Sequence, residues 1–211
     1  ETAENKGLEL KQELFQKIDQ EINNIITLNS EEGLDSEKVI EEFPNTLLIL
    51  VGGGADRGRL EGIVDKKNLQ KNVIFAGVAR GDKIKNYYAL ADLVLVTSKV
   101  ENEGLSMTAL EGLANGVLPI VSREAGGAEI LHKKRIGLVV RPRISDYSKA
   151  IISYLRDPAR YEKMLIEGEK WVRTDLSVEK FAKKTLSVYN SIINNADMSS
   201  SFGGGERKSR P

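Results

Sequence analysis

The chain has 211 residues, which suffices for one complete α/β domain or for one half of a two-domain enzyme. Its 31 basic and 31 acidic residues balance, so neither nucleic acid nor an anionic membrane is indicated as a partner. Without cysteine and with a single histidine, the sequence excludes disulfides, a thiol nucleophile and cysteine-ligated metal, and it disfavours a zinc site.

The N-terminal part of the chain is predicted to be helical. Apolar residues recur mostly at spacings of three or four over residues 8–28, which is typical of an amphipathic helix. Gly33 and the polar residues before it break this pattern, and a second helix is expected over 36–43. Residues 1–45 are therefore interpreted as an N-terminal helical segment that forms the remainder of the domain's first β/α unit.

Strands and helices alternate from residue 46 onward. Short β-branched runs predict strands, and apolar residues at helical spacing between them predict helices. The strands are expected at 46–51, 72–75, 92–97, 118–121 and 137–140. The helices are expected at 55–67, 81–90, 106–115 and 126–131. This alternation is typical of a parallel, doubly wound sheet.

The pattern then turns all helical, with helices expected near 145–155, 158–169 and 177–194. The final stretch, 197–211, has the composition of a flexible tail. The predicted fold class is therefore α/β, a Rossmann-like parallel sheet flanked by helices and followed by C-terminal helices. This domain is expected to occupy residues 46–196.

Two glutamates eight residues apart, Glu103 and Glu111, flank the point where strand 92–97 passes through a loop into helix 106–115. In parallel sheets ligands bind outside the carboxyl ends of strands, and the following helix points its N–H groups and positive dipole end at them. A diphosphate can dock there on backbone alone. Glu111 lies roughly 7 Å along the helix axis, at about 1.5 Å per residue. Because carboxylates repel phosphate, both glutamates are better suited to accept hydrogen bonds from sugar hydroxyls.

The glutamate pair occurs together with five further segments in a fixed order. They are 48–54, 72–78, 84–94, 118–122 and 125–131. The whole arrangement, over residues 46–141, resembles the donor-binding C-terminal domain of a retaining glycosyltransferase with the GT-B fold, of the family 4 type. A lone pair of glutamates at this spacing is a weak signal, whereas collinear segments in the right order are a strong one.

The resemblance implies a hexosyltransferase that takes an NDP-sugar donor, retains the anomeric configuration and needs no cofactor or metal. It assigns Glu103 to the donor sugar, where it is the catalytic candidate, and Glu111 to the ribose hydroxyls. Gly104, Leu105 and Ser106 stand where relatives have Gly-Phe-Gly beside the diphosphate. Ser106 is expected to keep its backbone N–H for phosphate and to cap the helix.

Further donor contacts are expected from glycine-rich turns and from a lysine. Gly53 allows close backbone approach to the nucleotide, although such glycines also serve simply in tight turns. Gly77 and Val78 border the nucleobase in this interpretation. Resembling enzymes also place an arginine after the first strand, and a lysine soon after it, against the diphosphate. Lys6 is the candidate for that lysine, with an exposed terminal lysine as the alternative, and no arginine-bearing strand is predicted before it.

Three alternatives remain open. A dinucleotide-binding protein is disfavoured because the Gly-x-Gly-x-x-Gly spacing fails at Arg57. A non-catalytic glycosyltransferase-like domain, acting as a structural or interaction module in a larger assembly, fits the absence of a predicted arginine-bearing strand. An NDP-sugar epimerase of related fold would need characteristic histidines and carboxylates that are not evident. Within the site, Glu101 competes with Glu103 because both lie in one loop.

The chain corresponds to only half of a catalytic cleft. A GT-B enzyme closes two Rossmann-like domains over donor and acceptor, so an N-terminal acceptor-binding domain is expected outside this chain, and the acceptor is unknown. The isolated half is expected to bind nucleotide without turnover. No apolar run approaches ~18 residues and no signal-peptide core opens the chain, which predicts a soluble, cytoplasmic protein.

Overall fold

The computed structural model describes residues 24–28, 36–98 and 104–201, with side chains over 38–98 and 104–193. The chain divides into two compact units, Glu1–Lys170 and Trp171–Pro211. The sheet and most of the helices belong to the first unit, and the boundary falls within a C-terminal helix.

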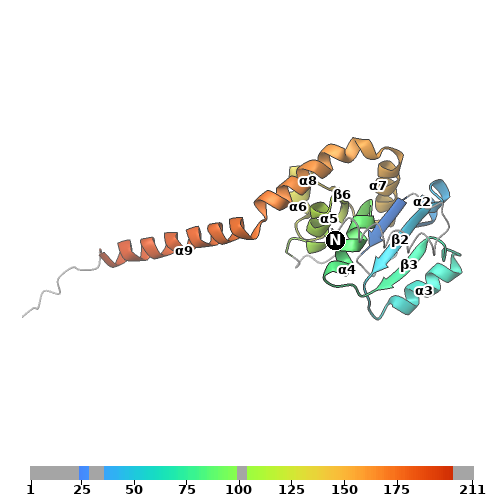
Figure 1. Cartoon of the computed structure of the whole chain (residues 1–211), viewed down its shortest axis with the longest axis horizontal. Helices are drawn as coiled ribbons and strands as arrows, with labels where there is room; N and C mark the ends of the chain where they lie inside the picture. Colours follow the sequence, from blue (N-terminus) through green and yellow to red (C-terminus); the bar gives the residue numbers. More distant parts are fainter. Residues whose placement is uncertain (1–23, 29–35, 99–103, 202–211) are drawn as a thin grey trace, which may run out of the picture. The chain divides into compact units, whose positions relative to one another are not determined.

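The first unit is built on a six-stranded sheet in which all neighbouring strands are parallel. The strands are β1 (Asn24–Leu28), β2 (Thr46–Val51), β3 (Val73–Gly77), β4 (Leu93–Val96), β5 (Leu118–Ser122) and β6 (Leu138–Val140). Their order across the sheet is β3-β2-β1-β4-β5-β6. Figure 1 shows β2 beside β3. This architecture confirms the predicted fold class.

Helices connect the strands and continue beyond the sheet. They are α2 (Ser36–Glu42), α3 (Arg57–Lys66), α4 (Asp82–Leu90), α5 (Met107–Ala114), α6 (Ala128–Lys134), α7 (Ile144–Arg156), the 3₁₀ turn η1 (Pro158–Tyr161), α8 (Glu162–Asp175) and α9 (Val178–Ser201). Every helix and strand predicted between residues 46 and 155 is present, with ends within a few residues of those expected.

The C-terminal helices differ from the prediction in two places. The helix predicted at 158–169 begins as the turn η1, because Pro158 lies at its start and the Asp157 carboxylate accepts the Arg160 N–H at 3.3 Å. Helix α9 extends to Ser201, five residues into the stretch predicted as a tail. Between Val178 and Gly203 the sequence has no glycine or proline that would end the helix earlier.

Strand β1 contradicts the predicted N-terminal helix at its end. The prediction of a helix over 8–28 is wrong for residues 24–28, which form a strand between β2 and β4. Ile26 pairs with Leu48 on one side and Leu93 on the other. A β-branched run such as Ile-Ile-Thr suits a strand, although the apolar spacing around it also fits a helix. Pairing with two neighbouring strands decides in favour of the strand.

Helices cover both faces of the sheet, as strand β4 shows. Leu93 and Leu95 belong to a core cluster with Tyr147 and Ile151 of α7. Val94, between them, packs with Tyr88 of α4. Because successive side chains of a strand point to opposite faces, α7 and α4 lie on opposite sides of the sheet. All of β4 and β5 is buried, as expected for central strands of a parallel sheet.

The strand order reverses between β1 and β4. The chain proceeds from β1 through β2 to β3 in one direction and from β4 through β5 to β6 in the other. In open α/β sheets ligands bind outside the carboxyl ends of the strands at such a switch point. A ligand site is therefore expected at the carboxyl ends of β1 and β4.

Candidate functional site

A pocket of about 370 Å³ lies at the carboxyl end of β4. Its walls come from the strand end and from the start of α5; they are Leu95, Val96, Ser98, Gly104, Leu105, Ser106, Met107 and Thr108. This volume falls within the range of about 300–1,000 Å³ that is usual for small-ligand sites. Three residues predicted to lie beside a diphosphate, Gly104, Leu105 and Ser106, therefore share one pocket at the switch point.

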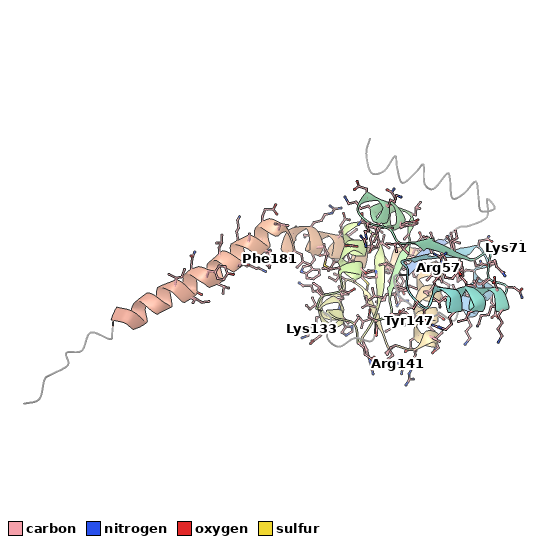
Figure 2. The ribbon with its side chains drawn as sticks, turned by 90° about the horizontal axis from the view of Figure 1, so that it is seen from below. Arg57, Lys71, Lys133, Arg141, Tyr147 and Phe181 are labelled. Atoms are coloured by element: carbon pink, nitrogen blue, oxygen red, sulfur yellow. The ribbon has the colours of Figure 1, made fainter. Side chains whose placement is uncertain are left out.

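The end of β4 is held in place by a helix on the other face of the sheet. The Tyr147 hydroxyl of α7, labelled in Figure 2, donates to the Val96 carbonyl at 3.0 Å. Both residues are buried, and Val96 is the last residue of the strand. A buried carbonyl that has a partner costs far less than an orphaned one, so this bond stabilises the strand end from which the pocket begins.

Helix α5 begins beside the pocket without a side-chain cap. Ser106 occupies the N-cap position with extended backbone angles, but its hydroxyl accepts no hydrogen bond from the first turn. The first N–H groups of a helix have no acceptor within the helix and form an anion-binding end. Ser106 therefore stands at the N-cap, as expected, but without a side-chain cap, and this end of the helix borders the pocket.

The backbone of Ser106 is already engaged. Its N–H donates to the Gly126 carbonyl at 3.0 Å, in the loop that follows β5. The N–H that the sequence assigns to phosphate thus has a protein acceptor in this structure. The bond ties the loop before α5 to the loop after β5.

The loop after β5 presses against Leu105 at Gly127. Gly127 has φ +79°, and a Cβ there would overlap the Leu105 side chain and lie 3.2 Å from Leu105 Cα. Only glycine can occupy this position without displacing Leu105, which lines the pocket. The loop before α5 and the loop after β5 are thus packed against each other.

Replacing Gly127 by alanine is expected to destabilise the protein more than the same change at Gly116. Both glycines have a positive φ, which costs a substituted residue roughly 1–2 kcal/mol. A Cβ at Gly116 meets nothing within 4 Å, whereas at Gly127 overpacking adds about 1–3 kcal/mol. Urea unfolding of both variants measures the difference, and equal losses would show that the contact with Leu105 is unimportant.

Glu111 lies on α5, half-buried, with a partner from another helix. The Tyr88 hydroxyl of α4 donates to Glu111 Oε2 at 3.0 Å. Burial raises the pKa of the Tyr88 phenol, the charge of Glu111 and the hydrogen bond to it add to the rise, and a hydrogen bond with Thr108 acts in the opposite direction. The phenol is therefore protonated and is the donor at neutral pH.

One oxygen of the Glu111 carboxylate therefore has a hydrogen-bond donor within the protein. Of the described residues on this helix face, Thr108 lines the pocket and Glu111 does not. Thr108 lies three positions before Glu111, so the two are neighbours on α5. Tyr88 interacts with both residues, and the sequence signal for this role is that a buried phenol needs a hydrogen-bond partner.

Gly53, Gly77 and Val78 come together at the ends of β2 and β3. The Gly52 N–H donates to the Gly77 carbonyl at 2.8 Å, and a Cβ on Gly53 would lie 3.1 Å from Val78 Cγ2. This group shares the carboxyl edge of the sheet with the pocket. Since β1 lies between β2 and β4, two strand spacings, about 10 Å, separate the end of β2 from the end of β4.

A positively charged side chain, that of Arg57, lies beside the group formed by Gly53, Gly77 and Val78. The Arg57 guanidinium, at the start of α3 (Figure 2), stacks over the Phe75 ring with 5.7 Å to the centroid. Its Nε also pairs with Glu61 at 2.7 Å. A Cβ on Gly77 would come within 3.9 Å of the guanidinium. Arg57 is thus a half-exposed charge beside the glycine turns.

The remaining predicted site residues, Glu103 with its competitor Glu101 and Lys6, lie outside the described part of the chain. Among the residues that the structure describes, no group of three or more His, Asp or Glu side chains is arranged to hold a metal ion. No helix in that part of the chain has both the length and the apolar character needed to span a membrane.

Comparison with known proteins agrees with this architecture. Residues 3–171 match the family of glycosyl transferases described as group 1. MJ1607, an uncharacterized glycosyltransferase of Methanocaldococcus jannaschii, is 31% identical over 153 residues, which cover 72% of this chain and 38% of that protein.

Two solved structures show the same fold. Sucrose-phosphate synthase from Thermosynechococcus elongatus has a TM-score of 0.68 and 27% identity, over 82% of this chain and 46% of its own. Anabaena HepE, solved with UDP and glucose, has a TM-score of 0.70 and 18% identity, over 85% and 51%. This chain spans about half or less of the length of these three relatives. The chain belongs to the group 1 glycosyl transferases.

Proposed function

We propose that this chain is the donor-binding half of a retaining hexosyltransferase of the GT-B family 4 type, which takes a hexosyl group from an NDP-sugar. The observation that carries the proposal is the pocket at the end of β4, which opens onto the uncapped start of α5 at the switch point of the sheet. A diphosphate is the ligand that such a helix end is suited to bind.

Each part of the donor has a proposed place. The diphosphate lies on the first N–H groups of α5, Glu111 accepts hydrogen bonds from the ribose, and Glu103 contacts the donor sugar as the catalytic candidate. The nucleobase lies toward Gly77 and Val78. Fixed N–H dipoles stabilise the negative charge that develops on the departing diphosphate, so the proposal requires neither a metal nor a protein nucleophile.

The rest of the enzyme is proposed to lie beyond this chain. The chain covers 38% of its archaeal relative and about half of the solved structures, which leaves room for an N-terminal acceptor-binding domain. On its own the chain is expected to bind nucleotide without turning over, and we place it in the cytoplasm. The UDP and glucose bound by HepE support an NDP-sugar as donor and leave the base of this donor open.

A non-catalytic glycosyltransferase-like module is the second candidate, and one observation favours it. In resembling enzymes an arginine and a lysine follow the first strand of the domain. Here the first strand described is β1, and the seven residues after it, 29–35, include three acidic residues and no arginine or lysine. Lys6 stays the candidate for that lysine and lies outside the described residues. Neutralisation of the diphosphate then depends more heavily on α5.

Calorimetric titration tests the proposal by comparing the affinities of UDP, GDP and ADP with those of the corresponding nucleosides. At least one diphosphate is expected to bind about tenfold or more tightly than its nucleoside, because charge-assisted hydrogen bonds to phosphate contribute about 1.5–3 kcal/mol. A chain that binds none of the three diphosphates would contradict the donor role and support the non-catalytic module. Equal affinity for nucleoside and diphosphate would exclude the start of α5 as the phosphate site.

A further inference from the structure

The Tyr88 hydroxyl is the polar tip of a side chain otherwise enclosed in the core. Tyr88 is 3% exposed and packs with Val94 and Val117 on one face of the sheet. A buried phenol that lacks a hydrogen-bond partner is costly, so the position of its partner is constrained by the fold. Here the partner is a carboxylate on a different helix, Glu111 of α5, at 3.0 Å.

Both ends of this hydrogen bond belong to rigidly packed elements. Next to Glu111, Gly112 brings α5 so close to β4 that an added Cβ would lie 2.5 Å from Val94 Cγ1. The helix also buries Leu113 completely. The same Val94 contacts Tyr88, so one valine fixes the spacing between the ring and the helix that bears Glu111.

The pair is connected to the pocket through Thr108. Thr108 lines the pocket, and its side chain is hydrogen-bonded to Tyr88. Thr108 and Glu111, three positions apart, occupy neighbouring places on the same face of α5. A chain of hydrogen bonds therefore runs from the pocket wall through the phenol to the Glu111 carboxylate.

We infer that Tyr88 is a positioning residue of the donor site: its hydroxyl holds Glu111 Oε2 so that Oε1 is presented to the ribose hydroxyls of the nucleotide. The inference rests on the proposed function, which assigns the ribose to Glu111. Without the phenol, the carboxylate samples several rotamers and must be ordered by the ligand, which costs affinity. Tyr88 acts only through Glu111 and makes no contact with the ligand itself.

The matched pair Tyr88→Phe and Tyr87→Phe tests this role in the whole chain. Each variant loses one hydroxyl from α4, but Tyr87 packs against a different cluster, with Leu47 and Ile49. The probes are UDP, GDP and ADP and their 2′,3′-dideoxy analogues, measured by calorimetry. Tyr88→Phe is expected to weaken the ribonucleotide about three- to tenfold and to leave the dideoxy analogue unchanged. Tyr87→Phe is expected to change neither.

A double-mutant cycle separates positioning from a general structural effect. In a Glu111→Ala background, Tyr88→Phe is expected to cause no further loss of affinity, because the carboxylate that it positions is gone. Equal weakening of ribo and dideoxy nucleotides, equal weakening in both backgrounds, or an unchanged affinity in Tyr88→Phe would each overturn the inference. Thermal unfolding establishes that each variant is folded at the titration temperature.

The same titrations distinguish failure of the inference from failure of the function. If the unaltered chain binds no nucleotide, the donor role itself is wrong and the role of Tyr88 falls with it. If the chain binds nucleotide and Glu111→Ala weakens it, but Tyr88→Phe does not, the donor role stands and only the positioning role is overturned.

Discussion

Replacing Glu111 by alanine is expected to weaken binding of the preferred nucleoside diphosphate by about 10- to 100-fold. A hydrogen bond to a charged group contributes about 1.5–3 kcal/mol, and a ribose offers two hydroxyls to one carboxylate. The loss is expected to vanish for the 2′,3′-dideoxy nucleotide, which has no diol. Calorimetric titration of both nucleotides measures it.

The control for this prediction is Glu167→Ala, which removes an exposed glutamate from α8. It removes the same charge from a helix and is expected to leave the affinity unchanged, since surface charges away from the site are screened by salt. If Glu111→Ala and Glu167→Ala bind nucleotide equally well, Glu111 is a structural partner of Tyr88 and does not contact the ribose.

Replacing Gly112 by alanine is expected to lower the free energy of unfolding by up to about 2 kcal/mol, because the new methyl group overpacks a completely filled contact at a cost of about 1–3 kcal/mol. Its Cβ would lie 2.5 Å from Val94 Cγ1 and 3.5 Å from the Val117 carbonyl, and both valines are buried. This cost exceeds the advantage of about 1 kcal/mol that alanine has over glycine in a helix. Urea denaturation, with the slope compared between variants, measures the change.

Gly62→Ala and a double variant serve as controls for the Gly112 prediction. Gly62 lies in α3, exposed, with nothing within 4 Å of an added Cβ, so alanine there is expected to stabilise the protein by about 0.4–1 kcal/mol. Combining Gly112→Ala with Val94→Ala is expected to cost less than the sum of the single changes, since the shortened side chain makes room. Strict additivity would show that the two residues do not compete for space.

Much of the sheet was predictable because local pattern and tertiary role agree. The runs at 46–51 and 118–121 consist mostly of Leu, Ile and Val, and both form interior strands of the sheet. Strand β1 was missed because Ile22 and Ile25 also fit a helical period, so the same residues satisfied two patterns. Its identity depends on pairing with β2 and β4, which local spacing does not encode.

The site was predictable in its location but not in its hydrogen bonds. The strand, loop and helix around Gly104 to Ser106 form the pocket that the sequence led us to expect. The engagement of the Ser106 N–H by Gly126 could not be foreseen, because it depends on how closely the loop after β5 approaches. The roles of Glu103, Glu111 and Lys6 toward a donor stay predictions.

The sequence by itself determined the alternation of strands and helices, the family and the glutamate-bearing loop and helix, because these follow from local propensity, periodicity and collinear motifs. Only the tertiary structure decided that residues 24–28 are the strand beside β4, that Tyr88 holds Glu111, and that Gly127 presses on Leu105. The physical reason is the same in each case. These features are contacts between residues distant in the chain, and their geometry is set by close packing of whole elements, which no local pattern specifies.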